Sequence, residues 1–296
     1  MPNAVINSER KDITELWYTE VDKNGFGKSF KVVQTLYKGQ SEFQSIDILE
    51  TSGFGRLLLL DGLVMTTEKD EFVYHEMISH IPLLAHPNPK QVLVIGGGDG
   101  GTIREVLKHP SVERAVLCEI DGMVIEASKQ WLPTIACALD DPKVEIQVAD
   151  GAAYVAKHKN TFDVILIDST DPIGPGARLF NKEFYQNVFE ALKPDGIMAN
   201  QSESPIANPQ EIRDIQELLS GVFPVIRPYT ATIPTYPGSY WLWNFCSKGT
   251  EPLANVNEPV AKEIEKQAKY YNRDVHKAVF ALPNFIRELV KTKQAV

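Results

Sequence analysis

Cysteine is scarce in this chain of 296 residues, and no two cysteines have the spacing of a metal or redox site. Cys118, Cys137 and Cys246 are scattered and odd in number, which favours free thiols in a reducing compartment. Long apolar runs are also missing, because the run at 57–60 is interrupted at once by Asp61. The first residues lack the apolar stretch of a signal peptide. We therefore expect a cytoplasmic protein with no membrane partner.

Basic residues are outnumbered, with 30 Lys and Arg against 39 Asp and Glu and a net charge of −9. Nucleic-acid binding needs a basic face, so this balance argues against a nucleic-acid partner. It is only weak evidence for a cationic ligand, because most acidic proteins are simply soluble. The length allows one large domain or two smaller ones, and the contents of 43% hydrophobic and 23% charged residues are typical of a globular protein.

The first third of the chain has the pattern of β-structure. Short runs rich in β-branched and apolar residues, separated by glycines, lie at 31–37, 44–50 and 56–60. The Asp61-Gly62 pair before residues 63–66 is typical of a hairpin turn. We predict a small antiparallel β-domain over residues 1–70.

Residues 71–296 have a different pattern and form the second predicted domain. An amphipathic helix is predicted over 70–84, ended by Pro87 and Pro89. Buried strands then alternate with helices, the strands at 92–95, 115–118, 144–148, 164–167 and near 197–200, and the helices at 102–108, 124–131, 152–157 and 182–192. This alternation predicts βαβ units and a parallel sheet, whose ligands lie beyond the carboxyl ends of the strands.

A glycine-rich loop follows the first of these strands and opens a helix. Gly96, Gly98 and Gly101 match GxGxxG, and Glu119 lies about 20 residues on, as in a dinucleotide-binding unit. Asp99 lies inside this loop, where a dinucleotide would place its pyrophosphate. Two like charges about 4 Å apart cost roughly 1–4 kcal/mol at surface-like dielectrics. The loop therefore suits a positively charged ligand better, such as a sulfonium nucleoside with an ammonium tail.

Two acids at neighbouring strand ends suit a nucleoside. Glu119 can accept both ribose hydroxyls, because an ionised carboxylate offers several acceptor sites. Asp150 can accept from the exocyclic amine of adenine. Each also has a structural alternative, as a solvated acid at a strand end or as the N-cap of the next helix.

A third strand end carries an acidic cluster. An apolar strand ends at Asp168 and is followed by Asp171 and by prolines that bend the loop away. With Asp99 from the neighbouring strand, three carboxylates surround one cleft, which is costly without a cation. A magnesium ion held by carboxylates alone is one alternative. We expect no metal, because no histidine or cysteine joins the cluster, and a diamine neutralises the acids with its two ammonium groups.

The cluster also provides the chemistry that an amine needs before it can attack carbon. An alkyl amine resembles lysine, with a pKa of about 10.4, so it is almost fully protonated at neutral pH and has no free lone pair. Asp168 is the natural proton acceptor, aided by a nearby tyrosine hydroxyl. Asp171 would hold the attacking or the distal amine. Attack next to a sulfonium loses charge, so positioning and desolvation can supply much of the rate.

Four separated motifs resemble those of the spermidine synthase family of polyamine aminopropyltransferases. They are Gly96-Gly-Gly-Asp-Gly-Gly101, Thr67-Glu-Lys-Asp-Glu-Phe72 with Tyr74-His-Glu-Met77, Asp168-Ser-Thr-Asp-Pro172 with Gly174-Pro175, and Ile233-Pro-Thr-Tyr-Pro237. The resemblance implies an α/β protein with a methyltransferase-like Rossmann fold and a parallel-rich central sheet, preceded by the β-domain and assembled as a homodimer or homotetramer. It implies transfer of the aminopropyl group from decarboxylated S-adenosylmethionine to putrescine, giving spermidine and 5′-methylthioadenosine. The donor is then a co-substrate, and no cofactor is expected.

The resemblance also implies roles for individual residues. Asp168 matches the family's proton acceptor. Contacts with the nucleoside are implied for Gln44, Glu119, Asp150, Gly151 and Pro175. Contacts with the aminopropyl group and the diamine are implied for Tyr74, His75, Asp99, Asp168, Ser169, Thr170, Asp171 and Tyr236. Taken alone, Gln44 would be a surface polar residue on a strand and His75 a satisfied helix histidine.

Two segments depart from the family pattern, 200–205 and 237–243, and both are expected at the diamine end of the pocket. The preferred amine therefore stays open among putrescine, cadaverine, agmatine and spermidine, and Trp241 is either core packing or a wall of the pocket. Two other functions remain alternatives. A methyltransferase would share the fold, but Asp99 would repel the carboxylate of its donor. A non-catalytic polyamine-binding protein would bind both ligands without turnover.

Overall fold

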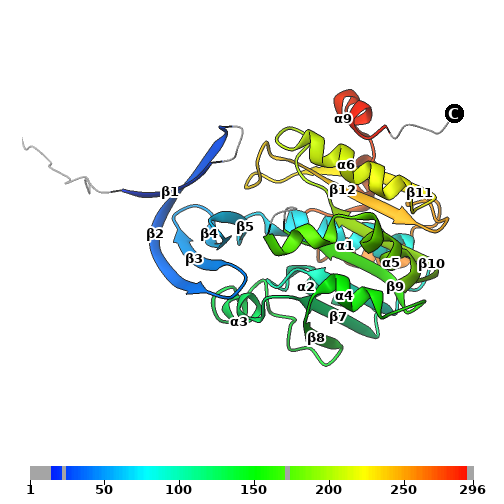
Figure 1. Ribbon diagram of the computed structural model, residues 1–296, viewed down its shortest axis with the longest axis horizontal. Helices are drawn as coiled ribbons and strands as arrows, with labels where there is room; N and C mark the ends of the chain where they lie inside the picture. The colour runs from blue at the N-terminus through cyan, green and yellow to red at the C-terminus, as the bar shows by residue number, and fades with distance from the viewer. Residues whose placement is uncertain (1–14, 22–24, 171–173, 292–296) are drawn as a thin grey trace, which may run out of the picture.

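The computed structural model describes residues 15–21, 25–170 and 174–291, and it contains two sheets that follow one another along the chain. The first is five-stranded and antiparallel, with its strands paired in chain order (Figure 1). Its strands are β1 (Leu16–Val21), β2 (Gly27–Gln40), β3 (Ser45–Thr51), β4 (Gly55–Leu60) and β5 (Leu63–Thr67). The predicted hairpin turn is present, because Asp61 and Gly62 have positive φ values of 49° and 79°, as a type I′ turn requires.

Apolar side chains occupy both faces of this small sheet. Ile46 and Ile48 alternate along β3 and pack, with residues of β4, against helix α3 (Gly122–Trp131). The opposite face forms a separate cluster around Phe30 and Leu57. Because α3 belongs to the larger part of the protein, the first of these contacts anchors the small sheet to it.

The second sheet has seven strands in the order β11-β12-β10-β9-β6-β7-β8. Its strands are β6 (Gln91–Gly96), β7 (Arg114–Glu119), β8 (Val144–Val148), β9 (Phe162–Asp168), β10 (Leu192–Gln201), β11 (Val225–Thr232) and β12 (Tyr240–Ser247). Strands β6 to β10 are parallel, while β12 is antiparallel to both β10 and β11. The predicted fold class is therefore confirmed, with β11 and β12 as additions that the alternating pattern did not indicate.

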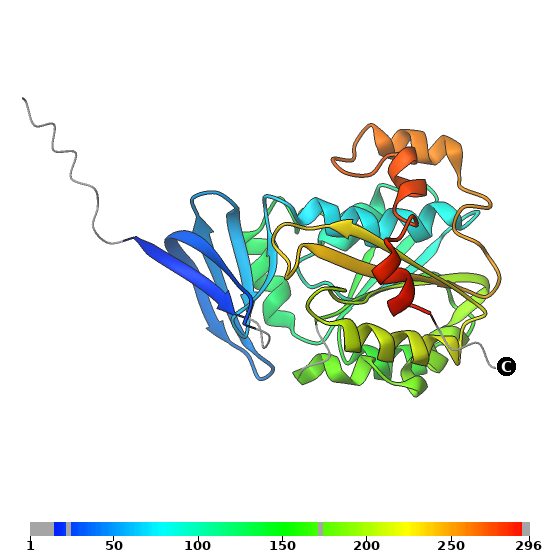
Figure 2. The same cartoon turned by 90° about the horizontal axis from the view of Figure 1, so that it is seen from above.

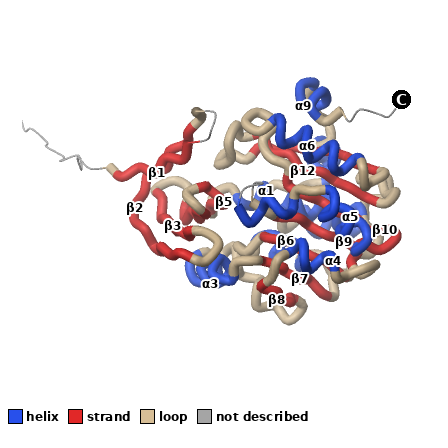
Figure 3. The backbone as a smooth tube through the Cα atoms, viewed as in Figure 1, coloured by secondary structure: helices blue, strands red, loops and turns tan. Residues whose placement is uncertain are grey.

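Helices cover both faces of the second sheet (Figures 1, 2 and 3). The first face is covered by α1 (Glu71–Ala85), α2 (Gly101–Leu107) and α3, and the second by α4 (Gly151–Ala156), α5 (Lys182–Ala191) and α6 (Pro209–Ser220). Along β6, Val92 and Val94 face the first layer while Leu93 and Ile95 face the second. A 3₁₀ turn, η1 (Gly174–Leu179), precedes α5, and α7 (Glu258–Glu265), α8 (Arg273–Ala278) and α9 (Asn284–Leu289) follow β12. None of the helices in the described residues is long and apolar enough to cross a membrane.

Helix α1 is not the amphipathic helix that the sequence predicts, because every residue except Phe72 is buried. The reason is that α7 and the segment after it cover the outer side of α1 (Figure 2). The Glu76 carboxylate of α1 accepts the backbone N–H groups of Lys269, Tyr270 and Tyr271 at 2.7–2.8 Å. This buried carboxylate thus fastens the C-terminal segment over the helix.

Candidate active site

A cavity of about 320 Å³ lies between the small sheet and the carboxyl ends of the parallel strands. The predicted site residues that line it are Gln44, Tyr74, His75, Asp99, Glu119, Asp150, Gly151, Asp168, Ser169, Thr170 and Tyr236. Asp171 lies outside the described residues, and the side chain of Pro175 is not described. The structure therefore brings the other predicted residues together, and their contacts with ligands stay predictions.

The glycine loop after β6 makes room for two functional side chains. Gly97 has a φ of +69°, and a Cβ atom there would lie 2.6 Å from Oδ2 of Asp168. A Cβ atom at Gly101 would lie 2.3 Å from the imidazole ring of His75. Both contacts are too short for any larger residue, so the loop lets a carboxylate and an imidazole approach the backbone closely.

Asp168 ends β9 and is held by two hydroxyl groups. Thr102 Oγ1 donates to Oδ2 of Asp168 at 2.6 Å, and the side chain of Tyr74 also hydrogen-bonds to this carboxylate. Burial, reinforced by the charge of Asp99, raises the pKa of Asp168, although His75 and the two hydroxyls act in the opposite direction. A carboxylate with a raised pKa is a stronger base, as a proton acceptor should be.

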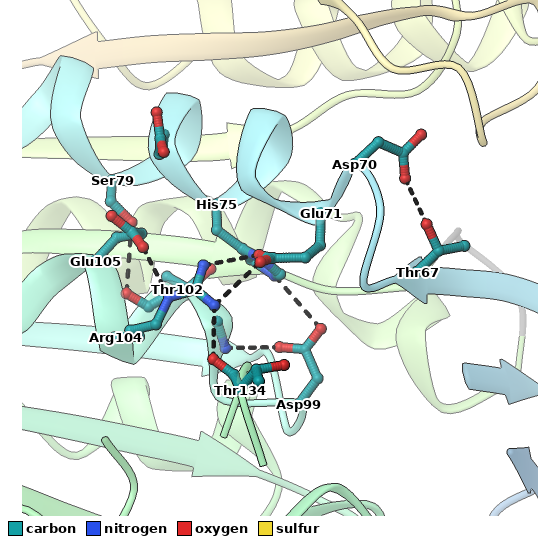
Figure 4. Close-up of polar contacts among 12 residues, drawn as sticks. Thr67, Asp70, Glu71, His75, Ser79, Asp99, Thr102, Arg104, Glu105 and Thr134 are labelled. Carbon is teal, nitrogen blue, oxygen red and sulfur yellow. Dashed lines mark hydrogen bonds and ion pairs between the residues drawn. The ribbon is translucent and has the colours of Figure 1, made fainter. Parts of the chain in front are cut away.

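Asp99 stays ionised beside Asp168. Burial acts to raise the pKa of Asp99, but the pKa is lowered because His75 and the N–H group of Gly101 favour the carboxylate. The Nε2 atom of His75 lies 3.4 Å from Oδ2 of Asp99, and its Nδ1 atom lies 2.6 Å from Oε2 of Glu71 (Figure 4). Of this acidic pair, Asp99 is therefore the carboxylate that keeps its charge more readily, and Asp168 is the one that takes a proton more readily.

The other end of the cavity holds Glu119 and Gln44, two of the residues predicted to contact a nucleoside. Burial, with a contribution from the Asp121 carboxylate, raises the pKa of Glu119 to about 7, while backbone N–H groups oppose this rise. One of these is the N–H group of Asp121, which donates to Oε1 of Glu119 at 2.9 Å. Gln44 lies just before β3 rather than on it, and its Nε2 donates to Oδ2 of Asp121 at 3.0 Å. Gln44 and Glu119 are therefore joined through Asp121 across the two sheets.

Asp150 caps helix α4, which confirms the N-cap role given for it as a structural alternative. Its Oδ1 accepts the N–H groups of Ala152 and Ala153 at 2.9 and 3.3 Å. Its Oδ2 accepts from Arg178 at 2.9 Å, and 75% of the Arg178 side chain is exposed. Burial acts to raise the pKa of Asp150, but the two N–H groups and Arg178 lower it. The cap fixes the carboxylate at the rim of the cavity, and Arg178 is exposed enough to give way to a ligand.

Aromatic side chains form the wall beyond the acidic pair. The rings of Tyr74 and Tyr236 meet edge to face at 5.8 Å, and Trp241 lies 4.5 Å from Tyr236. Trp241 is only 6% exposed and also lines the cavity, so it is both core packing and pocket wall. The hydroxyl of Tyr236 donates to the carbonyl group of Met65 at 2.6 Å, which fixes the ring.

The loop that carries Tyr236 is tied to two other elements. Asp70, at the start of α1, accepts the N–H group and the hydroxyl of Thr235 at 2.9 and 2.5 Å. Lys28 of β2 donates to the carbonyl groups of Pro234 and Tyr236. Burial lowers the pKa of Lys28 to about 8. The small sheet therefore helps to close the end of the cavity that Tyr236 lines.

Two polar residues of the cavity wall that were not predicted from the sequence lie at the end of β10. Gln201 donates through Nε2 to the carbonyl group of Ser169 at 3.2 Å and accepts the N–H group of Glu203 at 3.0 Å. Glu203 is buried, has a φ of +69° and lines the cavity. The segment was noted as atypical, but neither residue was given a role, although an acid just past a strand end was an available signal.

A second polar cluster lies at the amino ends of the parallel strands, away from the cavity. Among the described residues, His86, Asp163 and Asp195 bring possible metal-ligand atoms within 4.8 Å of one another. The ammonium group of Lys193 already lies 2.8 Å from Oδ1 of Asp163. This cation offsets the buried carboxylate, so the cluster does not require a metal ion.

Two family models together match the two sheets and the helices up to the start of α7. The spermine/spermidine synthase domain matches residues 71–258, and the spermidine synthase tetramerisation domain matches residues 16–68. Among solved structures, a spermidine synthase in complex with the transition-state analogue AdoDATO superposes with a TM-score of 0.91 at 49% identity, covering 93% of this chain and 94% of that one. The spermidine synthase of Thermotoga maritima has a TM-score of 0.90 at 46% identity, covering 97% and 99%.

Curated relatives agree with these structures. A polyamine aminopropyltransferase of Bacillus subtilis (strain 168) is 52% identical over 279 residues, which cover 94% of this chain and 100% of the relative. A polyamine aminopropyltransferase of Thermotoga petrophila is 50% identical over 275 residues, covering 92% and 93%. The match extends over both sheets and over every strand end that forms the cavity. This chain belongs to the spermine/spermidine synthase family.

Proposed function

We propose that this protein is a spermidine synthase, which transfers the aminopropyl group of decarboxylated S-adenosylmethionine to putrescine. The observation that carries this proposal is that the acidic pair of Asp99 and Asp168 shares one cavity with Glu119, an acid suited to binding a nucleoside. The pair offers negative charge to the ammonium groups of donor and acceptor. Family membership supports the same reaction.

The bonds, electrons and protons of this reaction are all accounted for by the two substrates and the residues of this chain. The amine nitrogen of putrescine attacks the carbon next to the sulfonium, so that one C–N bond forms as one C–S bond breaks. The electron pair of the broken bond stays on sulfur and leaves methylthioadenosine, a neutral thioether. The proton that the amine nitrogen loses goes to Asp168, which is oriented by Thr102 and Tyr74. No redox step or cofactor is needed.

The remaining site residues divide between the two ends of the cavity. Gln44, Glu119, Asp150, Gly151 and Pro175 would contact the nucleoside. Tyr74, His75, Asp99, Ser169, Thr170, Asp171 and Tyr236 would surround the aminopropyl group and the amine. The packed rings of Tyr74, Tyr236 and Trp241 offer an apolar wall to a methylene chain, which suits an aliphatic diamine.

An assay of two donors against a panel of amines tests this function. The decarboxylated donor with putrescine should give spermidine and methylthioadenosine in equal amounts by mass spectrometry. Ordinary S-adenosylmethionine should give no product, because the ionised carboxylate of Asp99, which lines the cavity, would repel the carboxylate of that donor. Methyl transfer from the ordinary donor would contradict the proposal. Faster turnover with cadaverine, agmatine or spermidine would change the proposed acceptor and keep the reaction class.

Asp168→Asn separates an enzyme from a binding protein. We expect a loss of turnover of about 10²–10⁴-fold, the usual contribution of a general base, with unchanged affinity for methylthioadenosine. Binding of both ligands by the wild type without any turnover would contradict an enzymatic function. Calorimetry and the product assay on the same preparations distinguish these results.

We further propose that copies of the chain assemble through the β1–β2 hairpin. Trp17 is opposite Lys31 in this hairpin, so Trp17, Val21 and Val33 share one face. These three side chains are 51%, 63% and 61% exposed. A cluster of large exposed apolar side chains favours a protein interface, and the matching tetramerisation domain supports a homotetramer. A cytoplasmic location is supported by free cysteines at all three positions.

A further inference from the structure

Both ring nitrogens of His75 face carboxylates. Nδ1 lies 2.6 Å from Oε2 of Glu71, and Nε2 lies 3.4 Å from Oδ2 of Asp99. A neutral imidazole carries one N–H group and can donate to only one of them, whereas the imidazolium donates to both. The ring is 3% exposed, so water cannot replace either partner freely. This geometry favours the charged form of His75.

Glu71 is itself fixed by a second cation. Arg104 makes two hydrogen bonds with it, from Nη2 to Oε2 at 2.8 Å and from Nη1 to Oε1 at 3.1 Å. The Nε atom of Arg104 donates to Oε1 of Glu105 at 2.8 Å. Charges thus alternate from Glu105 through Arg104, Glu71 and His75 to Asp99, as Figure 4 shows. A bidentate pair of this kind restricts the position of Glu71 more tightly than a single contact would.

This row of charges begins outside the cavity and ends at the acidic pair. His75 and Asp99 line the cavity, while Glu71 and Arg104 do not. The groups that face His75 are Glu71 and Tyr74 of α1, Asp99 of the glycine loop, Arg104 of α2 and Asp168 at the end of β9. Burial acts to lower the pKa of His75, but Asp99 and Glu71 raise it well above its usual range.

We propose that Glu71 and Arg104 are positioning residues, which hold His75 as an imidazolium against Asp99. Asp99 then keeps its charge for a bound ammonium group, and Asp168 is the member of the acidic pair that accepts the proton. The assignment of the proton rests on the proposed function, whereas the charge on His75 does not.

Nuclear magnetic resonance of the wild-type protein tests the charge directly. In protein labelled with ¹⁵N-histidine, the two ring nitrogens of His75 should both carry protons throughout the range from about pH 6 to pH 8. The signals are assigned by their loss in His75→Gln. A ring with one proton at pH 7 would overturn the proposal, whatever the enzyme's activity.

Glu71→Gln tests the consequence for catalysis. Without the carboxylate, His75 loses a partner of its charged form and becomes neutral at lower pH, so Asp168 loses a cation that favours its ionised form. The acidic limb of the pH profile of kcat/KM for putrescine should move upward by about one pH unit, a tenfold loss on that limb. Methylthioadenosine affinity should change less than about twofold, since Glu119 and Asp150 are untouched.

Glu76→Gln is the matched control, because Glu76 is a buried carboxylate on the same helix that faces the 269–271 segment instead. Its pH profile should match that of the wild type. Arg104→Lys keeps the positive charge but loses the bidentate contact with Glu71. It should therefore move the acidic limb of the kcat/KM profile in the same direction as Glu71→Gln, but by less. An unmoved limb in Glu71→Gln and Arg104→Lys, or an equal shift in Glu76→Gln, would overturn the proposal. A wild type without transfer activity would refute the proposed function instead.

Discussion

The hydroxyl of Thr102 donates to Oδ2 of Asp168 at 2.6 Å. Thr102 is the second residue of α2, directly after the last glycine of the loop, while Asp168 ends β9. The loop therefore supplies space for the carboxylate at Gly97, and the helix that the loop opens supplies a donor for it at Thr102. A hydrogen bond to the charged form favours that form, so Thr102 both orients Asp168 and moderates the rise of its pKa.

Thr102→Val should therefore remove a donor that orients Asp168 and keeps its carboxylate ionised. The side chain keeps its shape but loses the donor, and a hydrogen bond to a charged group contributes about 1.5–3 kcal/mol. We expect kcat to fall about tenfold, and the acidic limb of kcat/KM to move to higher pH, because the pKa of Asp168 rises further. Thr102→Ser, which keeps the hydroxyl, should retain both values. A pH profile of Thr102→Val identical to the wild type would contradict this role.

Gly101→Ala should displace the imidazole of His75. The added Cβ atom would lie 2.3 Å from Cε1 and Nδ1 of His75, so the ring or the start of α2 must move. Overpacking of this kind costs on the order of 1–3 kcal/mol of unfolding free energy. We also expect kcat/KM for the diamine to fall, because the contact between His75 and Asp99 is disturbed. Urea unfolding and steady-state kinetics measure the two effects.

The control for this change is Gly53→Ala, at a glycine with no atom within 4 Å of the added Cβ and no positive φ. Its stability and activity should stay within the ordinary range for a surface substitution, about 0.5 kcal/mol. If Gly101→Ala were as stable and as active as Gly53→Ala, the close packing of His75 on the glycine loop would have no functional consequence.

The strand-end acids were predictable because parallel strands place their carboxyl ends at one edge. Asp99, Glu119 and Asp168 each come at the end of an apolar run, and Asp150 follows the alternating Val144–Val148 strand, so local patterns were enough to bring them into one cavity. Strand β12 was not predictable in this way, because it returns antiparallel between β10 and β11 without a helical crossover. The hydrophobic pattern of the sequence identifies strands and helices that alternate along the chain, but it does not determine the order of strands in a sheet.

The support behind the acidic pair was only partly visible in the sequence. Glu71 and His75 are four residues apart on one helix, a spacing that places them side by side. Arg104 is 33 residues further along than Glu71, and only the packing of α1 against α2 brings the two together. The burial of α1 was misjudged for a similar reason, since the segment that covers it lies nearly 200 residues away in the chain.

The exposed face of the β1–β2 hairpin should be needed for assembly. Trp17→Ser with Val33→Ser removes two large apolar side chains that lie on one face and do not line the cavity. Buried tryptophan anchors contribute 2 kcal/mol or more to interfaces, so the dissociation constant should rise at least about thirtyfold. Analytical ultracentrifugation across a dilution series measures it. Leu253→Ser, at a side chain 47% exposed on another surface, is the control and should leave the assembly unchanged.

Nucleoside affinity should depend on pH through Glu119. Its pKa of about 7 means that the carboxyl is protonated below neutral pH, and a protonated carboxyl has fewer acceptor sites for the two ribose hydroxyls. Methylthioadenosine binding should therefore be constant above about pH 8 and should weaken by up to tenfold per pH unit below about pH 7. Glu119→Gln should bind weakly at every pH and lose this dependence.

Asp150→Asn is the matched control for that titration. Asparagine still caps α4, and the pKa of Asp150 is lowered by the helix N–H groups and Arg178 although burial opposes this. Asp150 is thus already ionised where Glu119 titrates, so its replacement should weaken binding without changing the slope against pH. Calorimetry between pH 5.5 and pH 9 separates the two variants. A slope that persisted in Glu119→Gln and vanished in Asp150→Asn would assign the titrating carboxylate to the adenine end instead of the ribose end.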